Sequence, residues 1–211
     1  MTIDEEFEII KEFVNTGEGS FKKPTSKSKN KYGDDAHLKS LQKIFKNSRN
    51  TSISIKEPQT ITDDALWEYI KLQKNLTDEK TSELAKYHKI AMSIETKLGS
   101  LLERFIYKYI QKHNWIWCSG NIIQDIDFIK KNTDEEGNVK WISLQVKNSD
   151  NSENDASSRV RDGTNIKKWF RRFSKVKDKD NWKELVEMVN ENDEELANEL
   201  TEENYIKYLK S

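Results

Sequence analysis

Asp125 and Asp127 in one segment, and Gln145 and Lys147 in another, are the residues best suited to chemistry. Both segments are rich in β-branched or aromatic residues, which predicts strands. Because side chains alternate across a strand, we expect the two acids to share one face of their strand. The amide and the ammonium group should likewise share one face of theirs. A hairpin turning about Glu136 would place Asp127 opposite Gln145 and Asp125 near Lys147. Two acids, an amide and an ammonium group would then converge on one patch.

Such a patch suits the hydrolysis of a phosphodiester with Mg²⁺. Carboxylate and carbonyl oxygens are the ligands that Mg²⁺ prefers. An adjacent lysine can orient or deprotonate an attacking water and can stabilise the charge that develops on the phosphate. A strand that ends in a solvated lysine beside a glutamine is the structural alternative, and the spacing leaves both open. It also leaves open whether Asp125 or Asp127 binds the metal directly.

The arrangement resembles the PD-(D/E)xK nuclease superfamily, in which an acid ending one strand is followed by an x-(D/E/Q)-x-K strand. Here the motif stands as Asp127 and then residues 145–147, QVK. Ile126 replaces the usual proline, and Gln145 stands where an acid is usual. One ligand would therefore be neutral, and we expect metal binding to be weaker or completed elsewhere. The resemblance makes Glu103 the expected supplier, because many members use a glutamate from the preceding helix.

The run from Leu144 to Arg172 resembles type II restriction endonucleases, and most closely their SinI-like group. In that group a Q-(V/I)-K strand is followed by an Asn/Ser-rich loop, an R-x-G-T element and a K-W-(F/Y)-R helix. All four parts occur in this run. The resemblance covers residues 95–183, and it leaves the helical N-terminal third without a counterpart.

This resemblance implies a Mg²⁺-dependent, sequence-specific endonuclease that cuts double-stranded DNA at a short palindromic site. Cleavage of both strands with one active site per chain implies a homodimer, because protein two-fold symmetry then matches that of the DNA. A cognate DNA methyltransferase is the implied functional partner. The implied catalytic residues are Asp127, Gln145, Lys147 and Glu103, and the implied metal ligands are Asp127, Gln145, the carbonyl of Val146, and Asp125.

Residues 148–164 directly follow the predicted catalytic strand and are expected to form a DNA-reading loop. Asn can pair with adenine edges and Arg with guanine edges in the major groove. The next residues, 165–173, are expected to form a helix whose basic face binds phosphates. A surface loop and a solvated helix face are the alternatives. The predicted DNA-binding residues are Asn148, Asn151, Ser152, Asn154, Ser157, Ser158, Arg159, Arg161, Thr164, Lys167, Lys168, Arg171 and Arg172.

The elements that must position these residues follow from hydrophobic spacing and capping signals. Period three-to-four patterns predict helices over residues 4–14, 36–48 and 77–109, one more after residues 62–64, and another over 182–189. Strands are predicted over residues 115–117, 122–129 and 139–147, and they could form a meander. We therefore expect an α/β fold with a restriction-endonuclease-like mixed sheet flanked by helices, and an N-terminal helical region.

Two regions are expected along the chain. Residues 1–75 would form the helical region, with a basic linker at 16–35, and residues 76–211 would form the PD-(D/E)xK-like core. Residues 16–50 contain nine Lys or Arg against three acids, and residues 159–183 contain ten against three. Both stretches could face a polyanion. The linker could wrap DNA as a flexible arm or be an ordinary solvated segment. Residues 184–211, with nine acids against two lysines, should avoid DNA.

Composition excludes several classes of protein. No apolar stretch approaches the ~18 residues of a membrane span, and the first residues are acidic where a secretory signal is basic, so we expect no membrane partner and a cytoplasmic location. A single cysteine excludes an internal disulfide and a thiolate zinc site. The rival function is a non-catalytic DNA-binding or assembly module on a nuclease fold, for which the neutral Gln145 is the main support.

Overall fold

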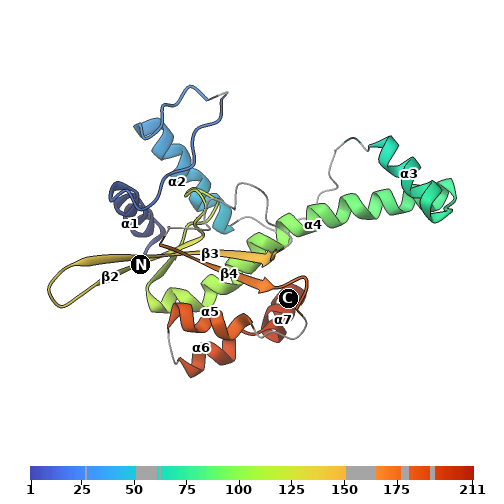
Figure 1. The fold of residues 1–211 in the computed structure, drawn as a ribbon. Helices are drawn as coiled ribbons and strands as arrows, with labels where there is room; N and C mark the ends of the chain where they lie inside the picture. The colour runs from blue at the N-terminus through green and yellow to red at the C-terminus, as the bar shows by residue number, and fades with distance from the viewer. Residues whose placement is uncertain (27, 51–60, 62, 151–164, 177–180, 191–192) are drawn as a thin grey trace. The chain divides into compact units, whose positions relative to one another are not determined.

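The computed structural model describes residues 1–211 except 27, 51–60, 62, 151–164, 177–180 and 191–192 (Figure 1). Residues 1–51 and 102–211 form one compact unit, and residues 52–101 form a second. Among the helices described, none has the length and apolar character needed to cross a bilayer.

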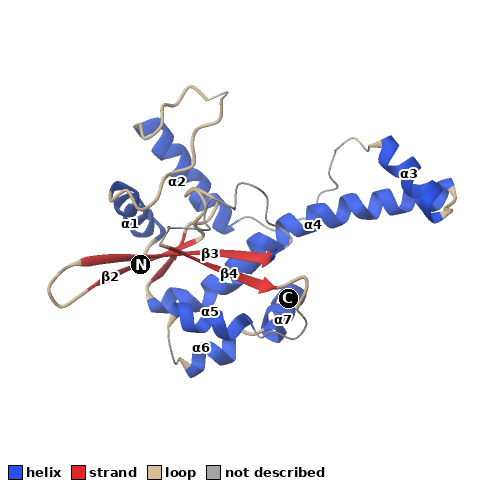
Figure 2. Cartoon of the chain, viewed as in Figure 1, coloured by secondary structure: helices blue, strands red, loops and turns tan. Residues whose placement is uncertain are grey.

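A four-stranded mixed sheet forms the centre of the first unit (Figure 2). Its strands are hydrogen-bonded in the order β1 (Trp115–Trp117), β2 (Phe128–Thr133), β3 (Val139–Ser149) and β4 (Ile166–Arg172). The first three form an antiparallel meander, and β4 joins β3 in parallel. With helices on both faces, this confirms the predicted α/β class and the mixed sheet.

The hairpin between β2 and β3 has the register that the sequence predicts. Phe128 lies opposite Leu144. The same register, extended by one residue, puts Asp127 beside Gln145. The turn is closed by Asp134, whose Oδ1 accepts the N–H groups of residues 136 and 138 at 3.0 and 2.8 Å. Gly137 adopts a φ of 85°, which glycine allows at no steric cost. This turn chemistry fixes the register on which the candidate site depends.

Helices cover both faces of the sheet in the first unit (Figure 1). One face packs against α1 (Ile3–Asn15) and α2 (Asp35–Asn50) through a core that includes Phe13, Phe45, Ile129 and Trp141. The other face packs against the C-terminal part of α4 (Asp78–Ile110), α5 (Asn181–Val189), α6 (Glu194–Glu199) and α7 (Glu202–Lys210). Its core includes Phe105, Leu144, Trp169 and Trp182.

The helices expected near residues 4, 36, 63, 77 and 182 are therefore confirmed, and α6 and α7 are additional. A short 3-10 turn, η1 (Gln111–His113), ends the α4 segment before β1. In the second unit, α3 (Asp64–Lys74) begins at the capping residue Asp63 and ends at Asn75, whose φ is 52°.

The predicted strand over residues 122–129 is wrong in its first half. Residues 118–127 are irregular and contain two non-glycine residues with positive φ, Asn121 at 52° and Asp125 at 60°. Ile126 and Phe128 pack into different core clusters, so the predicted common face does not exist there. The burial of Ile122, Ile123 and Ile126, which the apolar run predicted, is achieved by a compact loop instead of a strand.

The predicted helix over residues 165–173 is also wrong, because Ile166–Arg172 is strand β4. Its alternate residues face opposite cores: Trp169 packs among the α4 and α5 side chains, and Ile166 packs against the α1 and α2 side. A short amphipathic run with aromatic and β-branched residues fits both the helix period and the strand period. Here the hydrogen bonds to β3 stabilise the strand.

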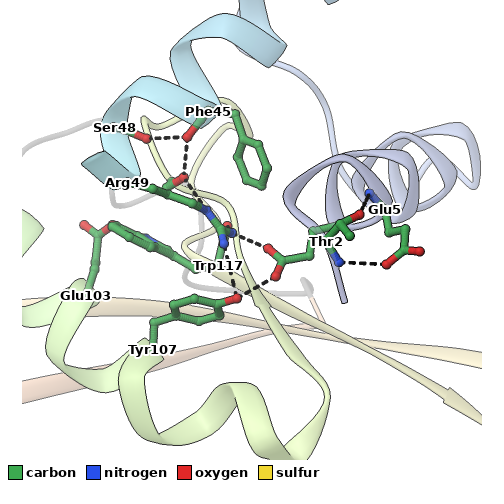
Figure 3. A network of polar contacts seen from close by, with 10 residues as sticks. Thr2, Glu5, Phe45, Ser48, Arg49, Glu103, Tyr107 and Trp117 are labelled. Carbon is green, nitrogen blue, oxygen red and sulfur yellow. Dashed lines mark hydrogen bonds and ion pairs between the residues drawn. The ribbon is translucent and has the colours of Figure 1, made fainter. Parts of the chain in front are cut away.

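A buried ion pair joins α1 and α2 to the sheet (Figure 3). Arg49 Nη2 lies 2.5 Å from Glu6 Oε2 and donates to the Trp117 carbonyl at 2.8 Å. The other guanidinium nitrogens donate to Tyr107 and Ser119 hydroxyls at 3.2 Å, and Tyr107 donates to Glu6 Oε1 at 2.6 Å. Both charged side chains are under 10% exposed. Four elements, α1, α2, α4 and β1, therefore share one polar network.

We predict that Arg49→Met lowers the free energy of unfolding by about 3–5 kcal/mol, because it leaves the Glu6 carboxylate buried without its cation. The matched control is Lys46→Met on the same helix, which removes an exposed ion pair with Asp4 and should cost less than about 1 kcal/mol. Urea denaturation measures both. Equal losses in the two variants would show that the Arg49 network does not hold the helices on the sheet.

Candidate metal-dependent site

Asp127 is held at the start of β2 by backbone hydrogen bonds. Its carbonyl accepts the Cys118 N–H at 2.8 Å, and its N–H donates to the Leu144 carbonyl at 3.0 Å. Its carboxylate Oδ2 accepts the N–H of Val146 at 2.8 Å. Asp127 thus precedes β2, whereas the sequence motif placed it at the end of a strand. The side chain is nevertheless fixed beside the QVK segment of β3.

Gln145 lies in the middle of β3 and is only 2% exposed. Its Oε1 atom is buried, and no donor to it exists among the residues that the structure describes. Leu144 and Val146 pack into the core on the opposite face, as the alternation predicts. Lys147, two residues along the strand from Gln145, shares its face and is partly exposed. An unsatisfied buried amide oxygen is costly, which makes it a candidate ligand atom.

Glu103 enters the same region from α4. Its Oε2 atom accepts the indole N–H of Trp117 at 2.8 Å (Figure 3). The pKa of Glu103 is raised from 4.5 to about 8. Burial is the largest cause and the charge of Asp127 the second, and both outweigh the Trp117 hydrogen bond and the Lys147 charge, which lower the pKa. The two carboxylates therefore repel each other.

Asp127 is affected in the same way. Its pKa is raised from 3.8 to about 6, chiefly by burial. The Val146 N–H and the Lys147 charge act against this rise, and the Asp125 carboxylate adds to it. Asp125 lies in the irregular segment before β2 and is partly exposed. Acids that resist ionisation in each other's presence gain stability from a cation placed between them.

The structure thus brings Asp127, Gln145 and the Val146 backbone together, with Glu103, Lys147 and Asp125 close enough to act on the carboxylate charge. In the described part of the chain, no three His, Cys, Asp or Glu side chains cluster tightly enough to hold a metal ion. The candidate ligands are instead mixed: carboxylate, amide and backbone carbonyl oxygens. Hard cations such as Mg²⁺ accept all three.

Most of the predicted DNA-reading loop lies outside the described residues. This applies to Asn151, Ser152, Asn154, Ser157, Ser158, Arg159, Arg161 and Thr164. Asn148 belongs to strand β3, not to a loop, and its Oδ1 accepts the Arg171 Nε–H at 3.3 Å. Asp150 accepts hydrogen bonds from the Ser174 N–H and hydroxyl at 2.8 and 3.1 Å, which join the residues that follow the C-terminal ends of β3 and β4.

Strand β4 separates the four predicted phosphate-binding residues into two pairs. Lys168 and Arg172 are in register with Gln145 and Ser149, and therefore share the face of the candidate site. Lys167 and Arg171 point to the opposite face. Lys167 Nζ donates to the Met188 carbonyl at 3.4 Å. The predicted common basic face does not exist, because a strand alternates its side chains where a helix would not.

Arg171 makes several contacts with other residues of the protein. Its Nη1 atom lies 2.5 Å from Glu202 Oε1 of α7, and its guanidinium stacks 5.3 Å from the Tyr205 ring. Its Nε bonds Asn148. These contacts orient Arg171 toward the C-terminal helices.

Trp117 is a site residue that the sequence analysis missed. Its indole orients Glu103, and its carbonyl binds Arg49, so it connects the candidate site to the buried network. The run WIW predicted a strand, but no spacing in the sequence marks which tryptophan reaches an acid fourteen residues earlier. Only the packing of β1 on α4 shows this contact.

Comparisons with known proteins show which proteins this chain is similar to. The sequence profile of the SinI restriction endonuclease family matches residues 2–211. The type II restriction enzyme Eco47I of Escherichia coli is 34% identical over 210 residues, which cover 99% of this chain and 86% of the relative. The type II restriction enzyme SinI of Salmonella infantis is 33% identical over 192 residues, covering 90% and 81%.

We predict that the metal-free protein loses stability as pH rises from about 4.5 to about 8. Below pH 4.5 the Glu103 carboxyl is protonated in both folded and unfolded chains; above it the unfolded chain ionises first and is favoured until the folded pKa is passed. Glu103→Gln should remove this part of the pH dependence. Urea denaturation in EDTA across this pH range measures it.

Glu187→Gln, at an exposed position of α5, is the matched control and should keep the wild-type pH profile. Identical profiles for wild type, Glu103→Gln and the control would mean that Glu103 ionises normally in the folded protein.

A second prediction separates the two arginines at the end of β4. Arg171→Ala should lower the free energy of unfolding by about 1–3 kcal/mol, because Glu202 and Asn148 lose a partly buried partner. Arg172→Ala, at an exposed position, should stay within about 0.5 kcal/mol of wild type and should weaken DNA binding on all sequences. Denaturation and anisotropy measure the two effects. Stability losses of equal size would contradict the assignment of the two faces.

Proposed function

Because the chain belongs to the SinI restriction endonuclease family, we propose that it is a type II site-specific deoxyribonuclease that hydrolyses both strands of DNA with Mg²⁺. The observation that supports this most strongly is the bond between the Asp127 carboxylate and the Val146 N–H, inside the segment that contains Gln145 and Lys147. This bond supports the proposal that an acid, an amide and an ammonium group contact the scissile phosphate together.

The oxygens present fit a divalent cation. Asp127, Gln145 Oε1 and the Val146 carbonyl would hold it, with Asp125 or Glu103 as a further carboxylate. The N–H and C=O of a strand residue point to the same edge, so the Val146 carbonyl is directed to the side on which its N–H meets Asp127. The orphaned Gln145 oxygen would gain a partner. When bound there, Mg²⁺ supplies Lewis-acid polarisation of the phosphate.

Side chains of the protein would supply the other groups that the hydrolysis needs. Lys147 would donate hydrogen bonds that orient the attacking water, and its charge would stabilise the negative charge that develops on the phosphate oxygens. Glu103, oriented by the hydrogen bond from Trp117, would lie at the edge of the same site and keep its carboxylate directed toward Asp127. These are the roles that we propose for the catalytic residues Asp127, Gln145, Lys147 and Glu103.

Recognition and assembly complete the proposal. Residues 148–164 and the Lys168 and Arg172 side chains would contact double-stranded DNA, the loop reading bases and the two cations binding phosphates. Two active sites are needed for the two strands of a palindromic site, so a homodimer is proposed. A methyltransferase that protects the same site, and a cytoplasmic location beside the DNA, follow from the restriction function.

A second function, binding without cleavage, is favoured by one observation only: Gln145 is neutral at a position where an acid is usual in the wider PD-(D/E)xK superfamily. A non-catalytic DNA-binding or assembly module would keep the fold and the basic surfaces but would not need Lys147.

We predict that the purified chain converts unmethylated phage DNA into discrete fragments with Mg²⁺ but not with EDTA. Lys147→Ala should reduce cleavage by at least about 10²-fold while keeping DNA binding, because the substitution removes one proton-handling group and no phosphate anchor. Gel electrophoresis and a mobility shift measure the two properties. Mapping the fragment ends gives the recognition site.

Lys140→Ala, in the exposed part of β3, is the matched control and should cleave like wild type. Intact DNA together with a salt-sensitive mobility shift would reject the endonuclease in favour of the binding module.

A further inference from the structure

The segment between α1 and α2 is docked on the irregular stretch that precedes β2. Residues 20–22 run antiparallel to residues 122–124, joined by two backbone hydrogen bonds of 2.8 and 2.9 Å. Phe21 and Ile123 lie opposite each other, and both are buried. Asp125 follows two residues after Ile123. One end of this basic segment is thus attached to the stretch that holds the proposed metal ligands.

The other end of the segment returns to the same place. His37, only 3% exposed, receives the Gly33 N–H on Nδ1 and bonds the Lys22 carbonyl through Nε2, both at 3.0 Å. A ring nitrogen that accepts from a backbone N–H leaves the proton on Nε2, which then donates to the carbonyl. The Tyr32 hydroxyl accepts the Phe21 N–H at 3.1 Å. Residues 20–34, called the basic loop below, are therefore closed at their base by buried contacts.

Three lysines of the basic loop carry charges that no nearby acid balances in the part of the chain that the structure describes. Lys22, Lys23 and Lys29 are exposed, and within the described residues none of them has a carboxylate within ion-pair distance. Lys31 is closer to an acid, because Asp34 accepts its N–H. By contrast, several lysines elsewhere are ion-paired: Lys11, Lys46, Lys71, Lys112, Lys131 and Lys207.

We propose that the basic loop is a docked phosphate-binding element, in which Lys22, Lys23 and Lys29 bind the DNA backbone flanking the scissile bond. The inference rests on the proposed endonuclease function and names a binding surface for it. Unpaired lysines retain their full charge for a polyanion. A loop closed at its base needs less ordering on binding than a free arm. Its attachment beside Asp125 gives it a fixed position relative to the candidate site.

Lysines that bind phosphates contribute to the salt dependence of DNA binding, and other surface lysines do not. Each phosphate contact adds about 0.9 to the slope of log affinity against log salt. Three such contacts correspond to a slope change of about 2.7, or an additional ~40-fold loss of affinity between 50 and 200 mM salt. Contacts to phosphates do not discriminate between base sequences.

The test is a salt titration of DNA binding, in EDTA, with a duplex that carries the site mapped by digestion. The triple variant Lys22→Gln, Lys23→Gln, Lys29→Gln should bind with a slope that is smaller by about 2–3. The control triple Lys112→Gln, Lys207→Gln, Lys210→Gln changes the net charge equally at the acidic C-terminal end and near α6. It should keep the wild-type slope, and both triples should keep the wild-type site preference.

Two outcomes would overturn the proposal: a basic-loop triple with the wild-type slope, or slopes that fall equally in both triples, which would make net charge the cause. If wild type cleaves DNA and either outcome is found, only this inference fails. If wild type binds DNA but never cleaves it with Mg²⁺, the proposed function fails, and the slope comparison on a DNA fragment that wild type shifts still decides the binding surface.

Docking of the loop is tested separately by amide hydrogen exchange. The N–H groups of Lys22 and Gln124 donate to backbone carbonyls across the pairing and should exchange slowly. The exposed N–H of Lys23 in the same loop should exchange fast. Rapid exchange at both Lys22 and Gln124 would contradict the docked arrangement.

Discussion

The hydrogen bond from the Val146 N–H to the Asp127 carboxylate joins the irregular segment before β2 to the central strand of the sheet. It removes the freedom of an acid that would otherwise swing on a loop, and it does so with a backbone donor that no substitution at Val146 other than proline can delete. The surrounding apolar core makes that carboxylate reluctant to ionise, and Glu103 is affected still more strongly. The site is therefore built as a set of oxygens that lacks enough positive charge, which is the condition for binding a cation.

The N-terminal helices support this arrangement through Arg49 of α2. Arg49 bonds the Trp117 carbonyl, and the indole of the same tryptophan bonds Glu103 (Figure 3). A region that showed no catalytic motif in the sequence thus contacts the residue that orients a candidate catalytic acid. The ion pair with Glu6 closes the chain of contacts from α1 to the site.

Features specified by neighbouring residues were predictable from the sequence, and features specified by tertiary contacts were not. The hairpin register followed from a turn about Glu136 and from the alternation in β3. The α6 and α7 helices had usable signals, since Asp193 and Thr201 cap them and acids follow in each first turn. Strand β4 was mistaken for a helix because seven residues are too few to separate the two periods. The Tyr107–Glu6 bond joins residues 101 positions apart, and no local pattern encodes it.

Binding of a divalent cation by Asp127 and Gln145 can be measured directly by Mn²⁺ titration with electron paramagnetic resonance, in the presence of a duplex that carries the mapped site. We predict that wild type binds Mn²⁺, that Asp127→Asn loses this binding, and that Gln145→Leu weakens it on the order of tenfold or more. The same three proteins should retain their DNA affinity in EDTA. Equal Mn²⁺ binding by all three would contradict the assignment of the metal site to these residues.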